Sequence, residues 1–143
     1  MFACMADEIR VRAEILEEML RHARREPEVE CCGALAGRDV VITKSFPAIN
    51  VLASPVAYEI SPQELFRIFH RMREEGLEHL AFYHSHPLGE NFPSARDIAQ
   101  AYYPNEAYFI ISPQVGVPRP VRAFSIRDDM VRELRIEIAA AGL

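Results

Sequence analysis

Cysteine, lysine and long apolar runs are scarce in the sequence, and each shortage excludes a class of protein. Three cysteines are too few for a disulfide framework, and no apolar run reaches the about 20 residues of a membrane span. The first residues lack the basic and apolar regions of a secretory signal. One lysine and scattered arginines, with a net charge of −5, form no basic stripe for nucleic acid. We therefore expect a cytoplasmic protein without a membrane or nucleic-acid partner.

The cysteines are Cys4, Cys31 and Cys32. If the adjacent pair Cys31 and Cys32 lies in a strand, the two side chains point to opposite faces. Because the chain has no C-x-x-C motif, we interpret the cysteines as small apolar core residues in a reducing compartment. A redox or zinc-thiolate role is the alternative.

The composition is otherwise that of an ordinary globular protein. Hydrophobic residues make up 50% of the chain and charged residues 26%, which excludes a disordered or collagen-like chain. The length of 143 residues suits one domain with a sizeable core. Since there is no internal repeat, low-complexity tract or linker, we expect a single domain over residues 1–143.

Hydrophobic periodicity predicts a succession of strands and helices. The clearest helix begins with Ser61 as N-cap, has Pro62 in its first turn and Glu64 at its third position, and ends at Gly76. Residues 113–120 are expected to form a surface loop. The order of elements predicts an α/β domain in which helices pack against a mixed sheet. The predicted strands are 9–11, 31–37, 40–46, 57–60, 80–83, 107–112, 121–126 and 133–138, and the predicted helices include 16–23, 61–72 and 94–102.

The stretch AFYHSHPLGENFPSARD carries the most specific pattern in the chain. Side chains two residues apart in a strand share a face, so His84 and His86 should project together. Leu80 and Phe82 should share that face farther along the strand. The two imidazoles would then lie at the open end of an apolar row, where they can chelate a metal ion.

A carboxylate follows the histidines at a helix start, from which Asp97 can project back toward the end of the strand. Zinc accepts neutral imidazole nitrogens at about 2.0–2.1 Å and a carboxylate oxygen, and catalytic zinc sites leave the fourth position to water. His84, His86 and Asp97 therefore predict a catalytic metal site. The alternative is a packed strand followed by a capped helix, because Ser94-x-x-Asp97 is also a capping motif.

A catalytic metal site also needs a proton acceptor for the attacking water, and a carboxylate can take this proton and pass it to a leaving amine. Glu28, Glu30 and Glu59 are candidates, and spacing alone does not choose among them. The three other histidines are expected to be structural or solvent-exposed: His22, His70 and His79.

The stretch HSHPLGENFPSARD resembles the signature of the JAMM metallopeptidases, also called MPN+ or JAB1 proteins: His-x-His, seven residues, Ser, two residues and Asp. The stretch ECCGALAG resembles the strand that carries the catalytic glutamate of these enzymes, which selects Glu30. The resemblance implies a cytidine-deaminase-like α/β fold, with zinc held by His84, His86 and Asp97. It also implies that Glu30 is the general base and acid and that Ser94 hydrogen-bonds the oxyanion of the tetrahedral intermediate.

Members of this family hydrolyse amide or isopeptide bonds after the Gly-Gly tail of ubiquitin or ubiquitin-like proteins, and small prokaryotic members act on sulfur-carrier proteins. The resemblance therefore implies a zinc-dependent peptidase acting at such a tail. The alternatives are a non-catalytic MPN-type scaffold and a small-molecule amide hydrolase that uses the same site. A nucleoside deaminase would require H-x-E and P-C-x-x-C motifs, which the chain lacks. The sequence predicts neither the identity of the carrier nor the oligomeric state.

Overall fold

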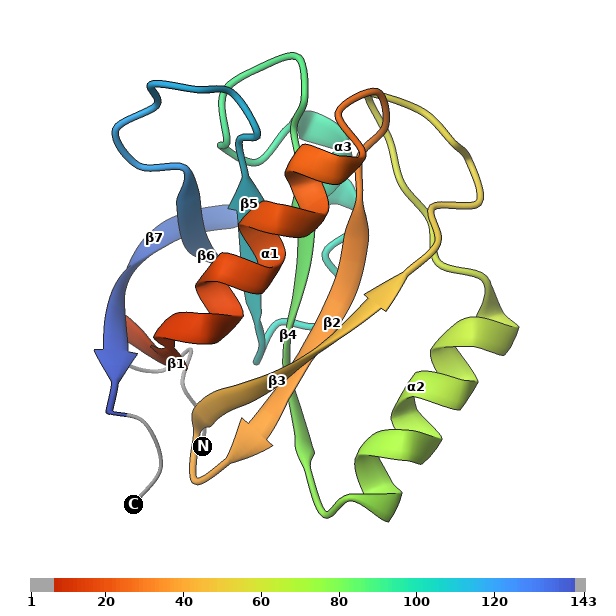
Figure 1. The fold of residues 1–143 in the computed structure, drawn as a ribbon, viewed down its shortest axis with the longest axis vertical. Coiled ribbons are helices and arrows are strands. Elements are labelled where there is room, and N and C mark those ends of the chain that lie inside the picture. The colour runs from red at the N-terminus through yellow and green to blue at the C-terminus, as the bar shows by residue number, and fades with distance from the viewer. Residues whose placement is uncertain (1–6, 141–143) are drawn as a thin grey trace.

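The computed structural model describes residues 7–140, so Cys4 lies outside the described residues. Within this range, strands and helices alternate over most of the chain (Figure 1). The elements are β1 (Glu8–Arg12), α1 (Ala13–Arg25), β2 (Cys32–Arg38), β3 (Val41–Ala48), α2 (Pro62–Glu74), β4 (Glu78–Ser85), α3 (Ala95–Ala99), β5 (Ala107–Ile111), β6 (Val121–Arg127) and β7 (Met130–Ala139).

The strands form one mixed sheet in the order β1-β3-β2-β4-β5-β6-β7, which closes where β1 pairs with β7. Three of these pairs are parallel: β1 with β3, β1 with β7, and β4 with β5. The other pairs are antiparallel. The prediction of a mixed sheet with helices packed against it is confirmed. The closure of the sheet was not predicted from the sequence.

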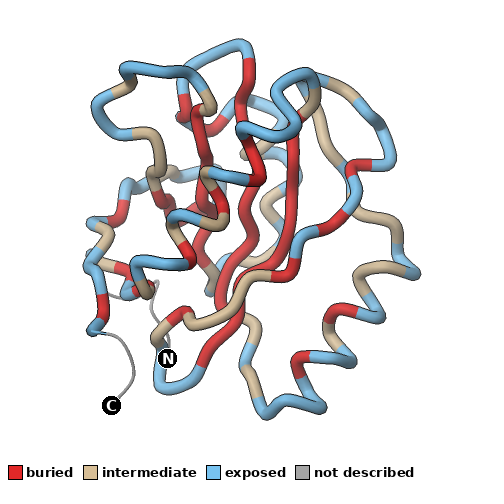
Figure 2. Tube along the Cα trace, in the orientation of Figure 1, coloured by how far each residue is buried: buried red, intermediate tan, exposed pale blue. Residues whose placement is uncertain are grey.

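Two apolar clusters fill the space on either side of the central strands, which Figure 2 shows as continuous buried segments. Helix α1 buries Ile15 and Met19 in the first cluster, and α2 buries Ile68 and Met72 in the second. Cys31 belongs to the first cluster and Cys32 to the second. Both thiols are free and buried, as expected of core residues that alternate along a strand.

The predicted strand at 57–60 is wrong, because no strand occurs there among the described residues. The backbone groups of this segment pair instead with the loop that precedes it. The Val51 N–H donates to the Glu59 carbonyl at 3.0 Å, and the Asn50 side-chain amide donates to the Ala57 carbonyl at 2.9 Å. The helix predicted over 94–102 is also shorter than expected, since α3 ends at Ala99.

The central strand β4 differs from the prediction near its start. The pairing of β2 with β4 shifts between Leu35 and Ala36, so that Ala81 lies opposite Leu35 while His79 lies opposite Ala36. Because this irregularity breaks the alternation of side chains, Leu80 packs in the first cluster. Phe82 packs in the second, so the prediction that these two residues share a face is wrong.

The pairing of β2 with β4 positions the site. Cys32 lies opposite His84 in an antiparallel pair, so the residues before β2 meet the residues after β4. The two strands approach closely at Gly33, where an added Cβ would run into the ring of Tyr83. The absence of a side chain at Gly33 therefore permits this approach.

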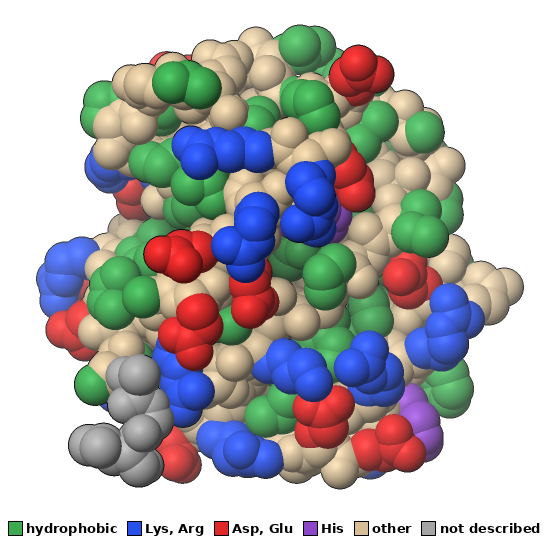
Figure 3. Space-filling view, in the orientation of Figure 1, with side chains coloured by type: hydrophobic (Ala, Val, Ile, Leu, Met, Phe, Trp, Pro, Cys, Tyr) green, Lys and Arg blue, Asp and Glu red, His purple; other side chains and the backbone are tan. Residues whose placement is uncertain are grey.

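Charged side chains of both signs are mixed on the surface. Figure 3 shows acidic and basic side chains interspersed on the face in view, with no large area of one sign. Among the described residues, no helix is both long and apolar enough to cross a membrane.

Candidate metal centre

The two histidines of the His-x-His motif point to the same place. His84 lies near the end of β4 and His86 just beyond it, and their Nε2 atoms are 3.1 Å apart. Ser85 points the other way, where its hydroxyl accepts a hydrogen bond from the Cys31 N–H at 2.9 Å. Both imidazoles are buried. The strand therefore presents two nitrogen donors on one side, as alternation requires.

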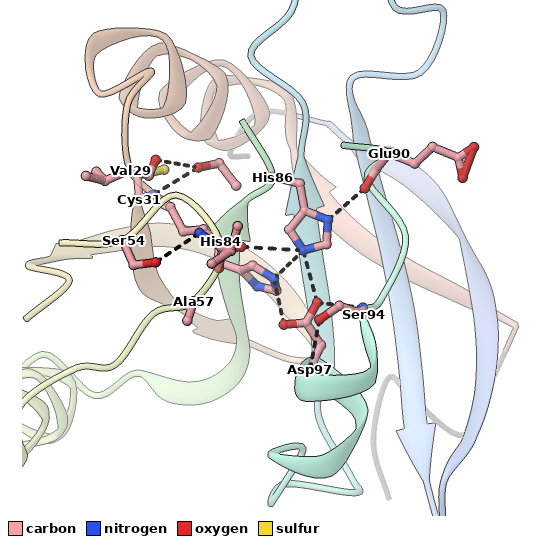
Figure 4. A network of polar contacts seen from close by, with 12 residues as sticks. Val29, Cys31, Ser54, Ala57, His84, His86, Glu90, Ser94 and Asp97 are labelled. Atoms are coloured by element: carbon pink, nitrogen blue, oxygen red, sulfur yellow. Dashed lines mark hydrogen bonds and ion pairs between the residues drawn. The ribbon is translucent and has the colours of Figure 1, made fainter. Parts of the chain in front are cut away.

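Asp97 reaches the histidines from the first turn of α3, as Figure 4 shows. Its Oδ1 lies 3.2 Å from His84 Nε2, and its Oδ2 lies 3.0 Å from His86 Nε2. The capping motif is also present, because the Ser94 hydroxyl accepts from the Asp97 N–H at 3.1 Å and the Ser94 N–H donates to Asp97 Oδ2 at 2.9 Å. The cap thus orients the carboxylate toward the imidazoles, and the two interpretations of this motif describe one structure.

The three donor groups have the spacing that a tetrahedral metal ion requires. With metal–ligand bonds of about 2.0–2.1 Å, neighbouring ligand atoms lie about 3.3 Å apart. The two Nε2 atoms are 3.1 Å apart, and each lies 3.2 or 3.0 Å from its nearer Asp97 oxygen, Oδ1 for His84 and Oδ2 for His86. Together with Glu30, these residues offer four ligand atoms within 4.8 Å of one another. Two imidazoles and a carboxylate form a donor set that zinc accepts.

Hydrogen bonds and burial set the protonation of the three groups that could bind a cation. His86 Nδ1 lies 2.7 Å from the Glu90 carbonyl oxygen, which can only accept, so Nδ1 carries a hydrogen. Nε2 faces Asp97 and would become the ligand atom when a metal displaces its own hydrogen. Burial lowers the pKa of His84 and so favours its neutral form. Burial alone would raise the pKa of Asp97, but hydrogen bonds from His84 and His86 outweigh it and hold that pKa well below its usual range. The pKa of His86 is raised despite burial, because Asp97 and Glu90 accept its hydrogen bonds. The carboxylate therefore favours positive charge at this point.

Glu30 lies beside the donor cluster, just before β2. Its Oε2 is 3.9 Å from His86 Nε2, and its Oε1 is buried with no hydrogen-bond partner among residues 7–140. Burial raises the pKa of Glu30 to about 7, which suits a group that takes up and releases a proton. Glu28 and Glu59 are both exposed and do not belong to the cluster. Of the three candidate acids, the structure brings only Glu30 to the centre.

The remaining histidines lie outside the cluster. His22 Nδ1 is 2.7 Å from the Tyr83 hydroxyl, and His79 Nδ1 is 2.8 Å from a carboxylate oxygen of Glu106. His70 is exposed on α2. These positions agree with the expectation of structural or exposed residues.

Two features of the centre have no signal in the sequence. The ring of Tyr58 stacks on His84 with ring centroids 4.6 Å apart. Beside them, His84 and Asp97 border a recess of about 240 Å³. Tyrosine side chains from separate parts of the chain contribute to its lining, among them Tyr58, Tyr102, Tyr103 and Tyr108. Tyr58 was missed because it falls in the stretch that the sequence predicts as a strand.

The fold and the centre define a JAMM-type metallopeptidase. The chain matches the family model described as prokaryotic homologs of the JAB domain over residues 12–127, and it belongs to that family. It is 39% identical over 108 residues to a desampylase from Haloferax volcanii, covering 71% of this chain and 78% of that protein. It is 28% identical over 130 residues to a CysO-cysteine peptidase from Mycobacterium tuberculosis, covering 90% of this chain and 89% of that protein.

Solved structures show the same fold. A solution structure of a protein from Desulfitobacterium hafniense superposes with a TM-score of 0.79 at 33% identity, covering 92% of each chain. A structure described as a JAMM metalloprotease-like zinc site in the proteasome and signalosome has a TM-score of 0.59 at 15% identity, covering 91% of this chain and 98% of that one. The latter likeness shows the fold alone.

Proposed function

We propose that the protein is a zinc-dependent peptidase that hydrolyses the amide bond after the C-terminal Gly-Gly tail of a ubiquitin-like or sulfur-carrier protein. The observation that carries this proposal is the convergence of His84, His86 and Asp97 at ligand spacing, with the buried carboxyl group of Glu30 beside them. The names of the relatives, desampylase and CysO-cysteine peptidase, support the substrate class.

The metal would be held by His84 Nε2, His86 Nε2 and a carboxylate oxygen of Asp97. A bound zinc ion lowers the pKa of a coordinated water toward about 7 and polarises the carbonyl group of the substrate. The short distances among the three donors support this ligand set. Glu30 lies farther from the imidazoles, so we assign it a role in proton transfer.

Glu30 would take the proton of the attacking water and deliver it to the leaving amine. Its Oε1 atom has no partner among the described residues, so this oxygen can accept a proton without breaking another contact. Because burial raises the pKa of Glu30 to about 7, the protonated form that must donate to the amine is accessible near neutral pH.

Ser94 would stabilise the negative charge that develops on the substrate carbonyl oxygen. Its hydroxyl oxygen already accepts the capping hydrogen bond from Asp97 N–H, which leaves the hydroxyl hydrogen free to donate elsewhere. Ser94 is exposed, so a substrate carbonyl can reach it. A donor held in place before the reaction begins stabilises an oxyanion at little cost in reorganisation.

The experiment that tests the proposal uses candidate sulfur-carrier proteins that end in Gly-Gly followed by either a single cysteine or a short peptide. Intact mass spectrometry after incubation should show loss of the extension and a carrier ending in Gly-Gly. A chelator should stop the reaction, and added zinc should restore it. Cleavage of a small amide such as a Gly-Gly dipeptide amide, with intact carriers left uncut, would instead identify a small-molecule hydrolase. No cleavage of any substrate by zinc-loaded protein would indicate a scaffold.

A further inference from the structure

We propose that Asn50 is a positioning residue for Glu30, and that it fixes the general base and the ring over His84 through one side-chain amide. This inference rests on the proposed function, because it assigns Asn50 a part in the same reaction. Asn50 is buried and follows β3, outside both the His-x-His motif and the strand that follows Glu30.

The side chain of Asn50 uses both of its polar groups. Its Nδ2 donates to the Glu30 carbonyl at 3.0 Å and to the Ala57 carbonyl at 2.9 Å, with a longer contact to the Ser54 carbonyl at 3.4 Å. Its Oδ1 accepts from the backbone N–H groups of Leu52 at 3.0 Å and Glu59 at 3.1 Å. An asparagine amide offers two donor hydrogens and one acceptor oxygen, so the residue type matches the set of partners.

These contacts hold the backbone of Glu30 itself, while Ser85 on β4 holds only its neighbour Cys31, through the Cys31 N–H at 2.9 Å and the Cys31 carbonyl at 3.0 Å. Glu30 precedes β2 and is not part of the strand. Its carbonyl accepts from Asn50, and its N–H donates to the Ser54 carbonyl at 2.8 Å. The carboxyl group has no anchor of its own, because Oε1 is without a hydrogen-bond partner among the described residues and Oε2 lies 3.9 Å from His86. Both hydrogen bonds made by the Glu30 backbone therefore come from the loop at 50–54, and the position of its carboxyl group depends on them.

The other contacts of Asn50 place Tyr58. Ala57 and Glu59, which flank Tyr58, are both bonded to the Asn50 side chain. The ring of Tyr58 stacks on His84, and Figure 4 labels Ser54 and Ala57 on the loop that carries this ring. One amide thus joins the segment that carries the base to the segment that covers a metal-binding imidazole. Loss of this amide should let both segments move while the donors on β4 and α3 stay in place.

Two substitutions test the role. Asn50→Asp keeps the shape and the acceptor oxygen but replaces the donating amide with a carboxylate, and Asn50→Ala removes all the contacts. The control is Tyr83→Phe, which removes one buried hydrogen bond, to His22, in the other apolar cluster and so lowers stability at a point away from the donor cluster. Each variant is compared with wild type and with Glu30→Gln for bound zinc, KM and kcat per zinc-loaded chain on a carrier with a C-terminal extension.

Both Asn50 variants should bind one zinc ion per chain and keep KM within about three-fold, while kcat falls about 10- to 100-fold, as small displacements of a catalytic group do. Tyr83→Phe should keep kcat. If the Asn50 variants keep the wild-type kcat while losing as much thermal stability as Tyr83→Phe, Asn50 is only a structural residue and the proposal is overturned.

A readout without substrate separates this inference from the proposed function. Backbone hydrogen exchange in Asn50→Ala should accelerate at Glu30 and at residues 51–59, and should be unchanged in β4 and α3. If wild type cleaves no tail, the proposed function fails, and the exchange pattern still decides whether Asn50 fixes the position of Glu30. Unchanged exchange at Glu30 would contradict the anchoring role in either case.

Discussion

The two halves of the candidate centre are built in different ways. The metal-binding half comes from neighbouring parts of the chain, since Asp97 follows His86 by 11 residues and is oriented by its own helix cap. The proton-transfer half comes from segments far apart in sequence, namely Glu30 before β2 and the loop that begins at Asn50. The first half is held by regular secondary structure. The second depends on side-chain and loop hydrogen bonds.

If the proposed roles hold, this difference means that metal binding and proton transfer can be disrupted separately. Donors at a strand end and a helix start keep their spacing as long as β4 and α3 remain folded. Glu30 can move without disturbing them, because its nearest approach to His86 is 3.9 Å. Substitutions in the metal-binding half should therefore remove zinc and activity together, while those in the other half should remove activity alone.

The largest effect is expected when a metal ligand is replaced. His84→Ala removes one of three donors, and Asp97→Asn replaces the carboxylate with a neutral and weaker amide ligand, so bound zinc should fall about ten-fold or more and tail hydrolysis below detection. Zinc content by elemental analysis and hydrolysis by intact mass measure the two effects. His70→Ala, an exposed histidine on α2, should leave both unchanged. Full zinc content in Asp97→Asn would remove the carboxylate from the ligand set.

A smaller effect is expected at Ser94. Ser94→Ala removes both the helix cap and the proposed donor to the oxyanion, and loss of one such donor lowers kcat by about 10²- to 10³-fold. Loss of the cap lowers the free energy of unfolding by about 1 kcal/mol. Steady-state kinetics and chemical denaturation measure the two effects, and zinc should stay bound.

The matched control for Ser94 is Ser61, the N-cap of α2, whose hydroxyl accepts from the Glu64 N–H at 3.1 Å. Ser61→Ala should cost a similar free energy of unfolding, about 1 kcal/mol, with kcat unchanged because α2 contributes no residue to the donor cluster. If both variants keep kcat, Ser94 is a cap and nothing more.

The same contrast explains what the sequence could predict. The convergence of His84, His86 and Asp97 follows from local rules, the alternation of a strand and the geometry of a helix start. The place of Glu30 follows from the antiparallel pairing of β2 with β4, in which Cys32 lies opposite His84. That pairing is non-local, so residue spacing could not decide which of three acids is the proton acceptor. Only the resemblance to a family selected Glu30.

The errors in the predicted fold also have local physical causes. The strand predicted at 57–60 fails because Asn50 takes hydrogen bonds that a neighbouring strand would otherwise make. Leu80 does not share a face with Phe82, as predicted, because the register of β2 and β4 shifts beside it. Neither a buried side-chain amide nor a strand irregularity leaves a periodic signal in the sequence.

The most direct test of the account is the comparison of Glu30→Gln with Glu28→Gln, a neighbouring exposed acid. We expect Glu30→Gln to bind one zinc ion per chain and to hydrolyse a Gly-Gly-extended carrier about 10²- to 10⁴-fold more slowly than wild type, the usual contribution of a general base. Glu28→Gln should match wild type in both measurements. Hydrolysis that survives in zinc-loaded Glu30→Gln at the wild-type rate would contradict the assignment of the base.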